Sequence, residues 1–88
     1  MTPAQTLSAA LQHPYTLASF RTLDKHAARP PGIDRTRALR LLRRNVRDVA
    51  PGATQETQQR VAIALLTQWR TTRNVRITNT RSVTHDTG

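Results

Sequence analysis

Cysteine is absent from the 88-residue sequence, and glycine and aromatic residues are scarce. Without cysteine the chain has no disulfide and no thiolate, so nothing in it requires an oxidising compartment. Its three glycines are isolated, which excludes a P-loop and a dinucleotide-binding fingerprint. Three aromatic residues offer little surface on which bases can stack, so single-strand recognition of the RNP-motif or OB-fold kind is not supported.

Acidic residues are also few. Five Asp and Glu residues are scattered along the chain and form neither paired carboxylates nor a nucleophile with its base. The histidines, His13, His26 and His85, lie on three different segments without the spacing of a metal site. We therefore expect a protein that is not an enzyme, with no catalytic residues, metal site, cofactor or small-molecule substrate.

Long hydrophobic runs are missing as well. The longest, Val61 to Leu66, has six residues, which is far too short to span a membrane. The first 15 residues lack both a basic n-region and a continuous apolar stretch, so they do not resemble a signal peptide. The sequence predicts a cytoplasmic protein without a membrane partner.

Arginine is what the chain has in abundance. Fourteen Lys and Arg against five Asp and Glu give a formal net charge of +9, and thirteen of the fourteen cations are Arg. The planar guanidinium binds phosphate with two parallel hydrogen bonds, so this bias favours a nucleic-acid partner. A GC-rich coding sequence, which enriches Arg over Lys without any selection for binding, is the alternative explanation.

Prolines, glycines and capping residues predict an all-α fold. The first helix should begin after Thr2 and end before Pro14, and the second should be capped by Thr16, with Tyr15 packed on Phe20. The expected apolar stripes of these two helices are Ala4, Leu7, Ala10 and Leu11, and Leu17, Phe20, Leu23 and Ala27.

Two further helices should follow the connector Arg29 to Gly32. Asp34 is the expected cap of the third helix, which Pro51-Gly52 ends, and Thr54 is the expected cap of a fourth helix reaching about Thr72. The sequence thus predicts a small bundle of about four helices in residues 1–72 and a basic polar tail in residues 73–88.

The tail has a different pattern. Two sets of residues alternate there with the period of a strand: Val75, Ile77, Asn79, Arg81 and Val83 in one, and Arg76, Thr78, Thr80 and Ser82 in the other. Because one strand is not stable alone in water, this segment would pair with another chain, lie along a nucleic acid, or form a flexible basic tail.

The third helix carries the strongest functional pattern. At 100° per residue five of its six arginines fall within an arc of roughly 120°, opposite its apolar residues. These arginines are Arg37, Arg40, Arg43, Arg44 and Arg47. Such a row can follow a phosphate backbone. A solvated helix face normally mixes charges of both signs, and here only Asp48 interrupts the row. Four later arginines extend the expected nucleic-acid surface: Arg70, Arg73, Arg76 and Arg81.

Three alternatives concern the fourth helix. Its main apolar face is Val61, Ala62, Leu65 and Trp69, and Ile63 points away from that face. Ile63, Leu66 and Trp69 are therefore candidates for contact with a protein partner or a second copy of the chain. The third and fourth helices also resemble a helix-turn-helix, in which Gln55 to Arg60 would reach base edges.

The sequence therefore predicts a small protein that binds the backbone of DNA or RNA. It would serve as an accessory subunit of a nucleoprotein complex or as a regulator of the phage or mobile-element type. The alternative is an adaptor or inhibitor whose basic face docks on an acidic protein surface of a nucleic-acid-processing complex.

Overall fold

Four helices make up the part of the chain that the computed structural model describes, namely the backbone of residues 2–87 and the side chains of residues 2–74. They are α1 (Pro3–Leu11), α2 (Pro14–Ala27), α3 (Arg35–Val49) and α4 (Gln55–Thr87). Residues 2–87 contain no strand. The predicted helical bundle is confirmed.

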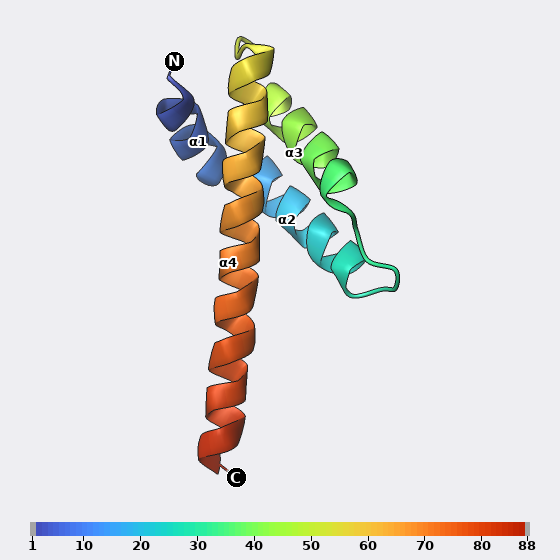
Figure 1. Cartoon of the computed structure of the whole chain (residues 1–88). Coiled ribbons are helices and arrows are strands. Elements are labelled where there is room, and N and C mark those ends of the chain that lie inside the picture. The colour runs from blue at the N-terminus through green and yellow to red at the C-terminus, as the bar shows by residue number, and fades with distance from the viewer. Residues whose placement is uncertain (1, 88) are drawn as a thin grey trace.

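The first half of α4 is the central element of the bundle. Helices α1 and α3 both pack against it, and in Figure 1 they flank it on opposite sides. Helix α2 crosses behind α4 and packs against α3. A helix that is apolar on more than one side needs such a central position, because each apolar side must be covered.

The core contains one cluster of buried side chains drawn from all four helices. Its fully buried large members include Leu23 of α2, Leu42 and Val46 of α3, and Leu65 and Leu66 of α4. Trp69 is only 5% exposed. Burying such a side chain stabilises the fold by about 1.5–3 kcal/mol, so this small cluster is the main support of the bundle.

Three of the predicted helix caps are confirmed. The Thr2 hydroxyl accepts from the backbone N–H of Gln5 while the Gln5 side chain accepts from the Thr2 N–H, which completes a capping box. Asp34 Oδ1 accepts from the N–H of Arg37 at 2.7 Å. Thr54 Oγ1 accepts from the N–H of Thr57 at 3.1 Å. Each bond satisfies a backbone donor that the first turn of a helix leaves unpaired.

The predicted start of the second helix is wrong. Helix α2 begins at Pro14, and its cap is His13, whose Nδ1 accepts from the N–H of Tyr15 at 3.1 Å. Proline is favoured at the first helical position because it lacks the N–H that would be unpaired there, and it keeps the preceding residue extended. Tyr15 is 57% exposed and contacts the ring of His13, so it forms no staple with Phe20.

The apolar stripes of α1 and α2 are also partly wrong. Leu11 and Leu17 are 45% and 54% exposed, and Ala4 is exposed too. The buried positions on these helices include Thr6 and Thr16 instead. Thr6 Oγ1 donates to the carbonyl of Thr2 at 3.1 Å, so burial of this hydroxyl is offset by a bond within its own helix.

Helix α4 continues past its predicted end at Thr72. No proline or glycine occurs between Gly52 and Gly88, so nothing in the sequence breaks the backbone ladder. The side chains of residues 75–88 lie outside the described part, and the strand-like pairing of the tail with a partner stays a prediction. Among the described residues no helix is both long and apolar enough to cross a membrane.

Candidate nucleic-acid interface

Helix α3 presents one face to the core and the other to solvent. Ala38, Leu42 and Val46 are buried, while Leu39 and Val49 pack against the same cluster. All five arginines of the predicted row are exposed. The apolar face therefore fixes the helix on α4, and the guanidinium groups project from the opposite side.

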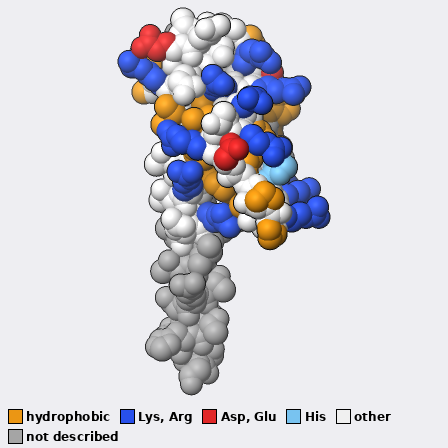
Figure 2. Space-filling view, turned by 45° about the vertical axis from the view of Figure 1, so that its right-hand side comes forward, with side chains coloured by type: hydrophobic (Ala, Val, Ile, Leu, Met, Phe, Trp, Pro, Cys, Tyr) orange, Lys and Arg blue, Asp and Glu red, His pale blue; other side chains and the backbone are white. Residues whose placement is uncertain are grey.

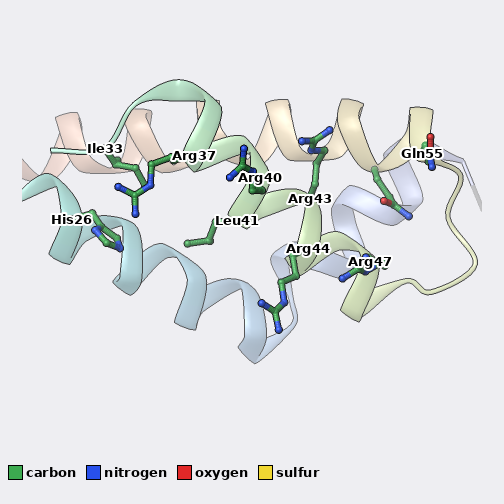
Figure 3. Close-up of a pocket in the computed structure, with 10 residues that line it drawn as sticks. His26, Ile33, Arg37, Arg40, Leu41, Arg43, Arg44, Arg47 and Gln55 are labelled. Carbon is green, nitrogen blue, oxygen red and sulfur yellow. The ribbon is translucent and has the colours of Figure 1, made fainter.

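The row of arginines lies in one open hollow of about 710 Å³, which we call the arginine hollow. Its lining residues are His26, Ile33, Arg37, Arg40, Leu41, Arg43, Arg44, Arg47, Gln55 and Gln58. Figure 3 shows Arg37 near Ile33 and His26 at one end, with Arg47 and Gln55 toward the other. The row from Arg37 to Arg47 spans ten steps along the helix, or about 15 Å of its axis. The structure thus brings together all five arginines that the helical period placed on one face.

No carboxylate lines the arginine hollow. Among the described side chains, none of its five arginines forms an ion pair with an acid. The ion pair found in this part of the chain joins Arg60 and Glu56 of α4 at 2.9 Å, and neither residue lines the hollow. Asp48 lies four residues after Arg44 but forms no ion pair with it among the described side chains. The positive charge of the hollow is screened by solvent or by a partner.

Lysine and arginine side chains gather on the face shown in Figure 2, with apolar atoms visible between them. No protein-family model, curated protein or solved structure matches the chain. The function of this face is therefore inferred from its charge, its shape and the packing of the helix that carries it.

A second hollow of about 390 Å³ lies between the connector after α2 and helix α4. We call it the tryptophan hollow, and it is lined by Ala27, Pro31, Gly32, Ile33, Ala38, Leu66, Trp69, Arg70, Arg73 and Asn74. Arg70 and Arg73 thus line a hollow of their own, and their predicted part in a nucleic-acid surface stays a prediction. Ile33 lines both hollows. The side chains of Arg76 and Arg81 lie outside the described residues.

Trp69 is held by contacts at its edge and its face. Its indole Nε1–H donates to Asp24 Oδ1 at 2.9 Å, and the guanidinium carbon of Arg73 lies 5.5 Å from the ring centroid. The first contact ties α4 to α2, and the second is a cation–π interaction. Asp24 therefore accepts a hydrogen bond from a residue 45 positions away, which its neighbours in the sequence do not indicate.

The three residues suggested for a partner interface lie in different environments. Leu66 and Trp69 belong to the core of this chain, and their apolar character is explained there without a partner. Ile63 is partly exposed. A partner surface formed by these residues stays a prediction, and within the chain only Ile63 has appreciable surface to offer it.

Asn45 is a structural residue that the sequence analysis missed. It is 4% exposed, donates through Nδ2 to Thr16 Oγ1 at 2.8 Å, and accepts at Oδ1 from Ser19 Oγ at 2.9 Å. These two bonds join α3 to α2 beside the arginine row. Because buried amides need partners, the network fixes how α2 borders the hollow.

Polar residues on neighbouring elements complete the arginine hollow. Gln55 is exposed at the first turn of α4, whereas Gln58 donates through Nε2 to the carbonyl of Ala53 at 3.0 Å. His26 comes from the last turn of α2. Nothing in the local sequence pattern links His26 to the arginines, because the two segments meet only through the fold. No group of three or more His, Asp or Glu side chains among the described residues is arranged to hold a metal ion.

Proposed function

We propose that this protein binds the sugar–phosphate backbone of nucleic acid through the arginine hollow. The observation that carries the proposal is the meeting of five exposed arginines, none of them in an ion pair among the described side chains, in one hollow that no carboxylate lines and that is built on a packed helix. Guanidinium groups bind phosphate oxygens with charge-assisted hydrogen bonds, and about 15 Å of row is long enough to meet several successive phosphates.

The same geometry supports affinity more than sequence specificity. Phosphate contacts orient a protein on nucleic acid but do not distinguish bases. Gln55 is the exposed amide at the edge of the hollow, and Gln58 is already bonded to the chain's own backbone. We therefore propose an accessory nucleic-acid-binding subunit or small regulator whose sequence preference is weak or supplied by another component.

The test compares two triple variants with equal charge. The site variant is Arg40→Gln, Arg44→Gln and Arg47→Gln, and the control is Arg21→Gln, Arg29→Gln and Arg35→Gln, whose residues line neither hollow. Each lowers the net charge from +9 by three, to +6. Fluorescence anisotropy with labelled DNA and RNA should show a large loss of affinity for the site variant. For this variant, the slope of log binding constant against log salt concentration should become shallower by about one unit for each phosphate contact removed.

Equal losses in the two variants would show that net charge alone attracts the nucleic acid. Binding that does not weaken between about 50 and 200 mM salt would also contradict the proposal, because displaced counterions make backbone binding strongly salt-dependent. A stoichiometric complex with an acidic protein that survives nuclease treatment, without retained nucleic acid, would instead support the adaptor or inhibitor alternative.

A further inference from the structure

We infer that the ligand of this surface is a nucleic-acid duplex, held by the arginine hollow together with Arg70 and Arg73 of the tryptophan hollow. The inference rests on the proposed function and names the class of nucleic acid. Three observations carry it: the two hollows share a lining residue, neither exposes a free Phe, Tyr or Trp ring on which bases could stack, and their cations stand on two helices packed on one core.

The adjacency comes from Ile33, which lines both hollows. Arg37 lies beside Ile33 at one end of the arginine row, as Figure 3 shows. Arg70 and Arg73 line the hollow on the other side of the same residue. The cationic surface therefore continues from α3 to α4 across the connector, and it gains two charges without an acid lining either hollow.

A stacking surface is missing because Trp69 is already engaged. The side chain is 5% exposed, its N–H is bonded to Asp24, and Arg73 lies over its ring. Tyr15 and Phe20, the other aromatic residues of the chain, line neither hollow. Proteins that hold single strands gain about 1–3 kcal/mol per base from aromatic stacking. No Phe or Tyr lines either hollow and Trp69 is covered by Arg73, so His26 is the one aromatic ring left to contribute in this way. What the surface mainly offers is contact with phosphates.

The cations are also fixed relative to one another. Leu42 and Val46 hold α3 in the core, and Leu66 and Trp69 hold α4 in the same cluster. Two groups of charges with fixed separation suit a stiff ligand, because a flexible strand must lose conformational freedom to meet both. A duplex also presents one negative charge per about 1.7 Å of its axis, which is the denser array.

The experiment measures anisotropy with a labelled duplex of about 20 base pairs, about 70 Å long, and with one of its strands alone. The duplex and the single strand are each prepared as DNA and as RNA, because the two kinds of duplex share the phosphate backbone. The kind that binds more tightly identifies the natural ligand. At about 0.1 M salt we expect the duplex to bind at least about tenfold more tightly than the single strand, a difference of about 1.4 kcal/mol.

The contribution of α4 is tested with the double variant Arg70→Gln/Arg73→Gln. The control, Arg29→Gln/Arg35→Gln, removes the same amount of charge at two residues that line neither hollow. For the duplex, the α4 variant should lose affinity and its salt slope should fall by about 1.8, or two contacts at about 0.9 each. The control should keep most of the affinity. Arg70→Gln alone leaves the Arg73–Trp69 contact in place and should give about half the change in slope, which guards against a folding defect.

The outcomes separate the inference from the proposed function. A single strand that binds as tightly as the duplex, with affinity still dependent on the α3 arginines, overturns the duplex inference and leaves the proposed function standing. An α4 variant that matches its control overturns the continuous surface. If neither strand nor duplex binds the parent protein, both the inference and the proposed function are wrong.

Discussion

At the scale of single residues, the arginine row is arranged for binding at some expense to the fold. Arginines three or four positions apart are neighbours on a helix, and like charges at this spacing destabilise it by about 0.2–0.5 kcal/mol per pair. Arg40 has three such neighbours, Arg37, Arg43 and Arg44, and no acid among the described side chains pairs with it. Asp48 is the one acid within α3, and this excess of positive charge is what distinguishes the face from an ordinary solvated one.

Replacing Arg40 by glutamine should therefore stabilise the protein. Three like-charge pairs are removed, so the free energy of unfolding should rise by about 0.6–1.5 kcal/mol at low salt, since Gln and Arg have similar helix propensity. Urea unfolding followed by circular dichroism measures the change, which should shrink near 1 M salt, where the Debye length is about 3 Å. Arg60→Gln is the matched control: it loses the Glu56 ion pair and should be slightly less stable than the parent. A destabilised Arg40→Gln would show that the row is not under repulsion.

Asn45 leads to a second prediction at this scale. Asn45→Ala removes the buried hydrogen bonds to Thr16 and Ser19 and should lower the free energy of unfolding by about 1–3 kcal/mol. The double variant Thr16→Val/Asn45→Leu takes the polar groups away from both sides of that contact. It should be less destabilised than the sum of its single variants. Additive losses, measured by urea unfolding, would mean that the Thr16–Asn45 bond contributes nothing specific.

At the scale of helices, the ends depend on local chemistry and are open to test. Asp34→Ala deletes the cap of α3 and should cost about 1 kcal/mol, whereas Asp34→Asn keeps an acceptor for the Arg37 N–H and should remain within a few tenths. Thermal unfolding of both variants gives the comparison. If the two substitutions cost the same, the carboxylate acts through its charge at the helix N-terminus and not through the capping bond.

Local signals also explain how much of the fold could be predicted. Caps such as Thr2, Asp34 and Thr54 act within three residues, and Pro51-Gly52 breaks the chain where it stands, so the sequence contains all the information needed. The prediction of Thr16 as a cap is wrong, and its hydroxyl is explained by the bond to Asn45, 29 positions away. Pro14 both ends one helix and begins the next, and the sequence pattern indicates only the first of these roles.

The candidate site likewise has a part that the local sequence predicts and a part that depends on tertiary packing. The five arginines of α3 share a face because of the helical period, and the structure brings them into one hollow as that period indicates. The neighbours His26, Ile33 and Gln55 come from three other segments, and only tertiary packing places them there. The separation of Arg70 and Arg73 into a second hollow likewise depends on the path of the connector, which no local pattern specifies.

At the scale of the whole molecule, a net charge of +9 on 88 residues opposes the compact state through self-repulsion. Added salt screens this repulsion, and a bound polyanion neutralises it at the site where it is concentrated. The protein is therefore expected to be more stable when its ligand is present, and the two effects differ in their concentration dependence. Salt acts at tens to hundreds of millimolar, whereas a specific ligand acts near its dissociation constant.

This difference gives a whole-molecule prediction. A duplex present at about 100 times its dissociation constant should raise the free energy of unfolding by about 2.7 kcal/mol, provided that it binds the folded chain alone. Trp69 is the single tryptophan and is buried in the core, so its fluorescence reports unfolding during the titration. The variant Arg40→Gln/Arg44→Gln/Arg47→Gln should gain far less at the same duplex concentration, although removal of like charges makes it intrinsically more stable. Equal stabilisation of parent and variant would place duplex binding outside the arginine hollow, because the stabilisation depends on the affinity that the replaced arginines contribute.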